Sequence, residues 1–157
     1  MNIFKMLIKY FLCAIMVIVL QSLILTYCLN NIYFSVSAGA KEQAYPEYAD
    51  KIMGFAGGIR NNTIFPIKIK SIEPFGGRGI EYVTTVITEW GFSEINRGEL
   101  FEKESLENKV IGPFSEYPIG HFYKFTGEYM VNPDAYEISF SIFGIKLSKI
   151  ELVGRVH

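Results

Sequence analysis

The sequence predicts an all-β protein, an immunoglobulin-like β-sandwich of about seven strands preceded by one N-terminal transmembrane helix. Three observations lead to this prediction. An uncharged apolar stretch of membrane-spanning length lies near the N-terminus. Segments of alternating apolar and polar residues follow it at intervals of about ten residues, separated by turn residues. That part of the chain shows no sustained helical periodicity.

The apolar stretch, Tyr10–Leu29, contains no charged side chain. As a helix it would be about 30 Å long, which is the thickness of a bilayer core. Lys5 and Lys9 are the only charged residues that precede the predicted outer domain, and positive flanking charge favours the cytoplasm. We therefore predict a signal-anchor and linker over residues 1–40, with the N-terminus inside the cell, and an extracytoplasmic domain over residues 41–157.

A cleaved signal peptide is the competing interpretation. Ala38-Gly39-Ala40 fits the small-residue pattern of a cleavage site, and cleavage there would release a secreted domain that begins at Lys41. The apolar part of a signal peptide is usually only about 7–15 residues long. Because the stretch here is longer and ends well before Ala38, the sequence favours an uncleaved anchor.

Both cysteines, Cys13 and Cys28, belong to the apolar stretch, where we interpret them as apolar filler. The bulky Tyr27 before Cys28 argues against a lipoprotein signal. Residues 41–157 contain no cysteine, which excludes a disulfide-stapled miniprotein and a cysteine zinc site.

Composition narrows the class further. Half of the residues are hydrophobic, 15% are aromatic and 20% are charged, which excludes a disordered charged tail. The net charge of −1 gives no overall bias toward nucleic acid.

The clearest strand is residues 136–142, where Tyr136, Ile138, Phe140 and Ile142 alternate with polar residues and are predicted to face the core. Gly144 permits a tight reversal into a last strand over residues 145–153, so the two should form a hairpin. Further strands are expected at 64–73, with an edge position or a start at Pro66, at 80–90 as a central strand, at 109–114 and at 120–131. Turns are expected at 74–79 and 132–134. Residues 93–108 should form a poor strand or a short helix, and residues 41–53 either helical turns or a linker that runs into a first strand.

The run Asn61–Ile72 (NNTIFPIKIKSI) resembles a recurring phrase of bacterial immunoglobulin-like surface modules, in which a polar N-N-T turn leads into a P-I/V-x-I strand. With the apolar segment in front, the chain resembles the small membrane-anchored or exported proteins of this type in Gram-positive bacteria. The resemblance implies a sandwich with Trp90 in the core position of the third strand. It carries over no catalytic residue.

We predict no catalytic, cofactor-binding or metal-binding residues. His121 is expected at a strand end or half-buried, and His157 is the solvated C-terminal residue. The interval 93–108 carries five glutamates interleaved with Arg97 and Lys103, which is typical of a solvated, salt-paired face. Calcium binding or glycosidase chemistry by paired carboxylates are the alternatives for this interval.

Two glycine-rich stretches, 54–58 and 76–79, lack the motifs of phosphate or dinucleotide sites, and we interpret them as turns. Asn61-Asn62-Thr63 matches a glycosylation sequon and is interpreted as an exposed turn. Most of the many aromatic residues should fill the core, while some could line an interaction surface. The aromatic residues considered are Tyr45, Tyr48, Phe75, Phe92, Phe114, Tyr117, Phe122, Tyr123, Tyr129 and Tyr136.

The functional hypothesis is a non-enzymatic, single-pass cell-envelope protein whose outer domain binds a protein or cell-wall partner. One alternative is a secreted β-sandwich, released after Ala40, that binds a soluble ligand. A second alternative is a small hydrolase that uses the acidic interval.

Overall fold

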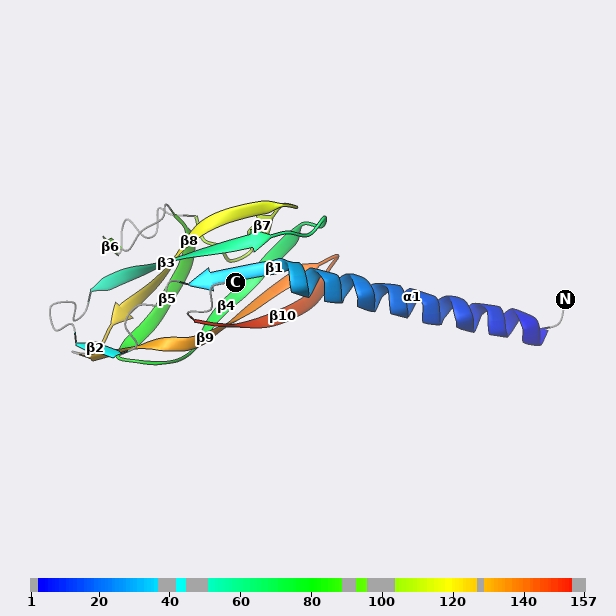
Figure 1. The fold of residues 1–157 in the computed structure, drawn as a ribbon, viewed down its shortest axis with the longest axis horizontal. Coiled ribbons are helices and arrows are strands. Elements are labelled where there is room, and N and C mark those ends of the chain that lie inside the picture. The colour runs from blue at the N-terminus through cyan, green and yellow to red at the C-terminus, as the bar shows by residue number, and fades with distance from the viewer. Residues whose placement is uncertain are drawn as a thin grey trace.

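A computed structural model describes residues 3–36, 42–44, 51–88, 93–95, 104–126 and 129–153. These residues form one helix and ten strands (Figure 1). In chain order the elements are α1 (Ile3–Asn31), β1 (Ile32–Val36), β2 (Glu42–Ala44), β3 (Ile52–Asn61), β4 (Ile67–Arg78), β5 (Ile80–Ile87), β6 (Ser93–Ile95), β7 (Val110–Ile111), β8 (Ser115–Phe125), β9 (Tyr129–Ile142) and β10 (Ile145–Leu152).

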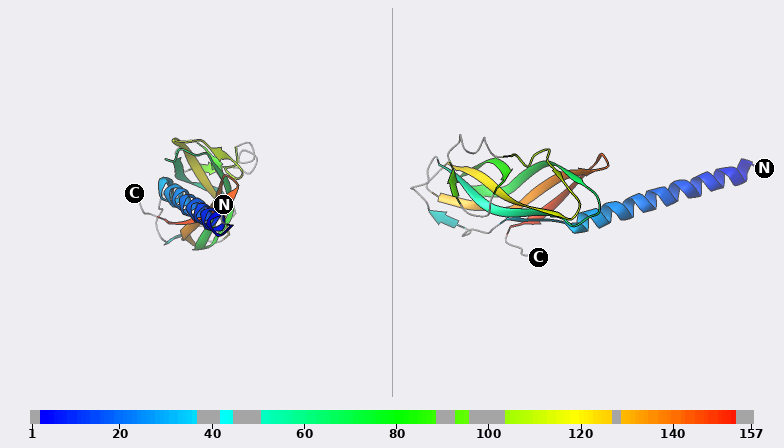
Figure 2. Two further views of the ribbon diagram at one scale, coloured as in Figure 1. Left: turned by 90° about the vertical axis from the view of Figure 1, so that its right-hand side faces the viewer. Right: turned by 90° about the horizontal axis from the view of Figure 1, so that it is seen from above.

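Helix α1 projects from one end of the sandwich (Figures 1 and 2). Its most apolar window has a mean hydropathy of 2.4, and only 6% of that window is buried. The Ser22 hydroxyl donates to the carbonyl of Ile18 at 2.9 Å, so this polar side chain is satisfied within the helix. The helix is long and apolar enough to cross a membrane, although a signal sequence has the same properties.

The strands form two antiparallel sheets. Sheet A has the order β1-β3-β8-β5, with β6 beside β3, and sheet B has the order β10-β9-β4-β7, with β2 beside β9. If β1, β3, β4, β5, β8, β9 and β10 are lettered A to G, the sheets become A-B-E-D and G-F-C. This is the strand arrangement of constant-type immunoglobulin domains. The predicted fold class, an immunoglobulin-like sandwich behind one N-terminal helix, is therefore confirmed.

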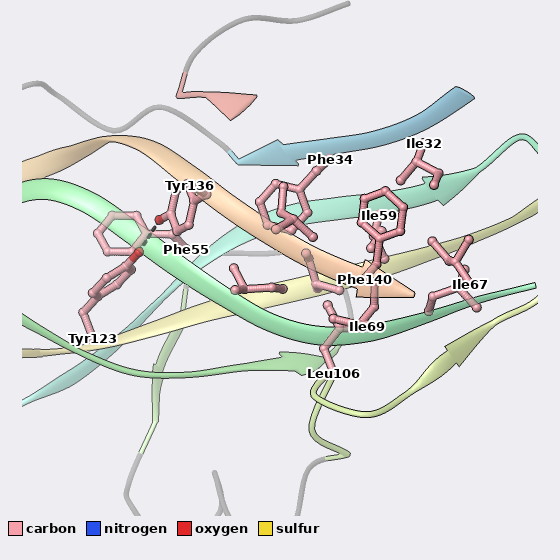
Figure 3. Close-up of a cluster of buried hydrophobic side chains, with 14 of the residues drawn as sticks. Ile32, Phe34, Phe55, Ile59, Ile67, Ile69, Leu106, Tyr123, Tyr136 and Phe140 are labelled. Carbon is pink, nitrogen blue, oxygen red and sulfur yellow. Dashed lines mark hydrogen bonds between the residues drawn. The ribbon is translucent and has the colours of Figure 1, made fainter. Parts of the chain in front are cut away.

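The core lies between the two sheets, as Figure 3 shows for side chains from β1, β3, β4, β8 and β9. The face predicted for residues 136–142 is correct, because Tyr136, Ile138, Phe140 and Ile142 are each at most 2% exposed. The predicted hairpin is also correct: β9 and β10 pair from Ile142 opposite Ile145.

The strand expected at 120–131 is wrong. Those residues are divided between the end of β8 and the start of β9. The turn expected at 132–134 is wrong as well, because β9 runs through it and pairs Pro133 with Gly76 of β4. Strand β10 ends opposite Ala135 and β2 begins opposite Val131, so the proline lies between the two strands that line that edge of β9. Proline has no backbone N–H to donate, so it fits at this gap, where neither β10 nor β2 pairs with β9.

The turn expected at 74–79 is wrong for residues 74–78, which belong to β4. Only Gly79 lies outside the strands, where the chain passes from β4 in sheet B to β5 in sheet A. Gly76 and Gly77 remain in β4 at φ of +73° and +87°, beside a register shift between Phe75 and Gly76. Glycine bends the strand there without ending it. Strand β5, expected to be central, is instead the last strand of its path in sheet A.

The first strand of the sandwich precedes the domain boundary expected after residue 40. Strand β1 follows α1 directly and pairs with β3 from Ile32 opposite Asn61 to Val36 opposite Gly57. Of residues 41–53, the structure describes 42–44, which form β2, and 51–53, where β3 begins at Ile52. None of these described residues is in a helical turn, and a strand begins within the segment as the linker alternative expected. Strand β4 begins directly after Pro66, as one of the two interpretations of that proline predicted.

Candidate functional site

The junction between α1 and the sandwich is built from backbone contacts. The N–H of Asn62 donates to the carbonyl oxygen of Asn31, the last helical residue, at 2.9 Å. This bond supplies a partner to one of the carbonyls that a helix C-terminus leaves unpaired. One turn before the end, Cys28 is fully buried, and Ile24 and Leu29 pack against the main core. The last turns of α1 are therefore part of the folded domain.

Asn61 is the centre of a buried hydrogen-bond network at this end of the sandwich. Its amide nitrogen donates to the carbonyl oxygens of Phe65 at 2.8 Å and Gly112 at 2.9 Å. Its side-chain oxygen accepts from the N–H of Thr63 at 3.0 Å and lies 2.8 Å from the Thr63 hydroxyl. The network therefore joins the β3–β4 turn to the loop that follows β7.

The interpretation of Asn61-Asn62-Thr63 as an exposed turn is wrong for two of its three residues. Asn61 and Thr63 are both 0% exposed. An oligosaccharide on the Asn61 nitrogen would replace one of the two N–H groups that bond to Phe65 and Gly112, and the fully buried side chain leaves no access for a sugar, so the folded domain cannot carry one there. The polar segment Asn61-Asn62-Thr63 specifies a turn because its side chains form hydrogen bonds with nearby backbone groups.

Strand β1 is also held from its open side. Lys149 of β10 donates from Nζ to the carbonyl oxygen of Ile32 at 2.8 Å and forms a 2.6 Å ion pair with Glu151. The same ammonium group lies 5.5 Å from the ring centroid of Tyr33. The contact spans both sheets, because β1 belongs to sheet A and β10 to sheet B.

His121 lies inside the core, in the middle of β8, and not at a strand end or half-buried as expected. Its Nδ1 is 2.8 Å from the Thr85 hydroxyl, which is itself 2.8 Å from the Tyr82 hydroxyl. The rings of Phe34 and Tyr136 pack on the imidazole at centroid distances of 5.2 and 4.9 Å. Burial lowers the pKa of His121 to about 3, so the ring is neutral at physiological pH.

A second polar contact crosses the core. The hydroxyl groups of Tyr123 on β8 and Tyr136 on β9 share a hydrogen bond (Figure 3, dashed line). Burial raises the pKa of both phenols above the ordinary value, so both remain protonated. The pair links the two sheets and satisfies two polar groups that would otherwise be unpaired in the core.

A small cavity lies between β4 and β5 and is lined in part by Tyr82, Thr85 and Glu107. Its volume is about 120 Å³. Sites for small-molecule ligands usually have volumes of about 300–1,000 Å³. The cavity is therefore smaller than a typical ligand site.

The acidic interval is only partly described. Glu104 forms a 2.6 Å ion pair with Lys109, and Glu107 is exposed. Within the described ranges, no group of three or more His, Cys, Asp or Glu side chains is placed to hold a metal ion. Glu99, Glu102 and Trp90 lie outside the described residues.

Apart from Tyr33 and Val110, the exposed large hydrophobic residues of the described sandwich fall into two groups. The first, which we call the apolar tip, consists of Ile64 (58% exposed), Phe114 (69%) and Phe143 (69%). These residues lie in the turns at the end from which α1 leaves.

The second place, which we call the sheet B patch, consists of Phe75, Ile150 and Leu152. Leu152 and Phe75 flank Ala135 from β10 and β4, so the patch crosses three strands. Of the other aromatic residues considered above, Phe122, Tyr123 and Tyr136 are buried and Tyr117 is half-buried. The side chains of Tyr45, Tyr48, Phe92 and Tyr129 lie outside the described set.

The chain is thus a single immunoglobulin-type β-sandwich continuous with an apolar N-terminal helix. No protein-family model and no curated protein sequence matches it. Among solved structures it is similar to the GAE domain of GGA2p from Saccharomyces cerevisiae, with a TM-score of 0.31 and 7% identity, over 77% of this chain and 84% of that chain. The strand order, and not this likeness, defines the fold class.

Proposed function

We propose that the protein is a non-enzymatic, single-pass cell-envelope protein whose outer sandwich binds a protein or cell-wall partner. The observation that carries the anchoring is the continuity of α1 with β1. A removable signal peptide is ordinarily joined to the mature domain by a segment that the fold does not need. Here the helix leads directly into a core strand, which supports retention of the helix.

Cleavage after Ala40 would remove β1 together with the helix. The domain would lose Ile32 (2% exposed), Phe34 (6%) and Cys28 (0%) from its core. It would also lose the five-residue pairing with β3, and the edge of β3 would be left open. Burial of apolar surface is the main term that stabilises a small domain, so this loss weighs against the secreted alternative.

Orientation follows from charge. Lys5 and Lys9 precede the uncharged stretch, and the N-terminal side of a span with such residues tends to stay in the cytoplasm. The sandwich is then extracytoplasmic, which agrees with the resemblance to anchored surface proteins of Gram-positive type.

The sheet B patch is the proposed partner surface. Phe75 is 45%, Ile150 61% and Leu152 46% exposed. Glu151 pairs with Lys149, which bonds to Ile32 of β1, so the side chain of Glu151 points inward. Because successive side chains of a strand point to opposite faces, its neighbours Ile150 and Leu152 point outward. Exposed apolar side chains gathered on one sheet face are typical of protein interaction sites.

Topology is tested with the full chain carrying a C-terminal tag. We expect an uncleaved product that stays in the membrane pellet after a carbonate wash, and a tag that external protease removes from spheroplasts. The control is Ala40→Tyr, which blocks small-residue cleavage and should give a product of unchanged mass. A soluble product beginning at Lys41 would overturn the anchor, and a protected tag would overturn the orientation.

Partner binding is tested by cross-linking on intact cells. A chain with both Ile150→Ser and Leu152→Ser should lose the cross-linked product, whereas Lys146→Ser, an exposed change on the same strand, should keep it. Equal cross-linking of both variants would exclude the sheet B patch.

The non-enzymatic part is tested by complementation of a deletion strain. We expect complementation by His121→Gln and by a chain with both Glu102→Gln and Glu104→Gln, provided that each is folded and displayed. Failure of a displayed glutamate variant would favour calcium binding or glycan chemistry in the acidic interval.

A further inference from the structure

We propose that the apolar tip, Ile64, Phe114 and Phe143, lies in the interface of the bilayer that α1 crosses, so that the sandwich rests on the membrane surface. This inference rests on the proposed anchoring. It assigns the tip a lipid partner and adds a second point of attachment beyond the helix.

The first argument is position. Ile64 lies in the β3–β4 turn, Phe114 in the β7–β8 loop and Phe143 in the β9–β10 turn. Figures 1 and 2 show the β3–β4 turn and the β9–β10 hairpin at the end of the sandwich where α1 leaves it. The tip therefore lies at the end of the sandwich next to the exposed apolar helix.

The second argument is backbone conformation. Phe114 and Phe143 have φ of +52° and +51°. This left-handed region costs a bulky L-residue about 1–2 kcal/mol, and glycine or asparagine is the usual occupant. Phe143 with Gly144 forms a two-residue hairpin turn in which asparagine is favoured at the first position. Phenylalanine at both positions is unfavourable for the backbone and for solubility. Both residues are 69% exposed, Phe143 even with its contact to Phe65, so we attribute their benefit to a contact outside the domain.

The third argument is that the tip is held in place. The ring of Phe65 packs on that of Phe143 at a centroid distance of 4.9 Å. Asn61 ties the backbone of Phe65 to that of Gly112, two residues before Phe114. Three loops distant in sequence are thus fixed as one unit, and little ordering is required when they meet a surface.

The fourth argument is depth along the helix. Tyr10 and Tyr27 are both exposed and are separated by about 26 Å of helix, which matches the aromatic positions at the two faces of a bilayer. Ile24 lies about 4.5 Å deeper than Tyr27 and packs against the core of the sandwich. The end of the sandwich therefore reaches the level of the headgroups, where apolar side chains are buried by about 5–10 Å.

The test uses tryptophan fluorescence of the full chain in phosphatidylcholine vesicles with and without brominated acyl chains. Trp90, the only tryptophan, is first replaced by phenylalanine. Phe114→Trp and Phe143→Trp then report on the tip. Phe75→Trp is the matched control, because Phe75 is also exposed and its partner Ala135 lies about 23 Å along β9 from Ile142.

We expect bromination to quench the emission from the two tip positions and to change that of the control little, because side chains in the interface lie about 5–10 Å deep, beside the acyl chains. Vesicle flotation and thermal unfolding of each variant are measured in parallel. A chain that floats but whose tip tryptophans are no more quenched than the control overturns the inference and leaves the anchor intact. A chain that fails to float overturns the anchor, and the inference with it.

Discussion

Asn62 donates its backbone N–H to the carbonyl oxygen of Asn31 at 2.9 Å, which joins the turn after β3 to the last residue of α1. The same turn contains Asn61, which is opposite Ile32 in the β1–β3 ladder. The helix end, the first strand and the β3–β4 turn are therefore one structural unit.

Asn61→Ala should destabilise the domain, because it leaves the carbonyl of Gly112 and the N–H of Thr63 without their partner. Each buried polar group left unpaired costs about 1–3 kcal/mol. Asn62→Ala is the control, since its backbone bond to Asn31 is retained. Denaturant unfolding of the detergent-solubilised chain measures both. Equal stabilities would contradict the role of Asn61 as the centre of the network.

Phe34→Ala should cost about 3–5 kcal/mol, the usual cost of truncating a buried phenylalanine. Its ring is 6% exposed and contacts His121 and Tyr136 at centroid distances of 5.2 and 5.8 Å. Ser35→Ala, on the exposed face of the same strand, should have little effect. Similar melting temperatures for the two variants would show that β1 is dispensable and would revive the secreted alternative.

Phe140→Ala should be comparably severe, about 3–5 kcal/mol, because Phe140 is fully buried between the sheets. The neighbouring Ser139 is 6% exposed and faces the other side of sheet B. Ser139→Ala removes only a hydroxyl group and should change stability little. Thermal unfolding compares them, and a larger loss for the serine variant would mean that the core face is misassigned.

The stability of the domain should fall as the pH drops below 6.5. Folding lowers the pKa of His121 from 6.5 to about 3, so the unfolded chain binds a proton that the folded chain excludes. The stabilisation is fully present above pH 6.5 and is lost progressively toward pH 3. Between pH 7 and pH 5 the loss should be about 2 kcal/mol.

His121→Gln should remove this part of the pH dependence. Denaturant unfolding at pH 7 and pH 5 measures the difference for each protein, and the comparison within one protein cancels the cost of the substitution itself. An unchanged pH dependence in the glutamine variant would mean that His121 is accessible to protons in the folded state.

Phe114→Asn should raise the stability of the domain in detergent by up to about 1 kcal/mol, because asparagine tolerates a φ of +52° better than phenylalanine does. The same change should weaken contact with lipid, since it removes an apolar side chain that is 69% exposed. Thermal unfolding in detergent measures the change in stability. Binding of the apolar tip to vesicles measures the change in lipid contact. A variant that loses stability would contradict the argument from backbone strain.

The sequence by itself determined the class of the protein. The uncharged run Tyr10–Leu29 determined the helix. Alternation at Tyr136, Ile138, Phe140 and Ile142 determined the most reliable strand and its buried face, because residues of one parity in a strand share a side. Gly144 located the final hairpin. These features depend on neighbours in the chain, and local spacing is enough to predict them.

Only the tertiary structure decided which strands are neighbours and which polar residues are buried. Residues 132–134 read locally as a turn, yet pairing with β4, in which Gly76 is opposite Pro133, keeps them in β9. Asn61 was expected in an exposed turn and His121 at a strand end or half-buried, yet both are fully buried. Phe65 and Gly112 supply partners to Asn61, and Thr85 supplies one to His121. Likewise, Ile64, Phe114 and Phe143 are distant in sequence, and only the folding of two sheets brings their turns to the end where α1 leaves. The physical reason is that pairing and burial depend on contacts between distant segments, which no local pattern records.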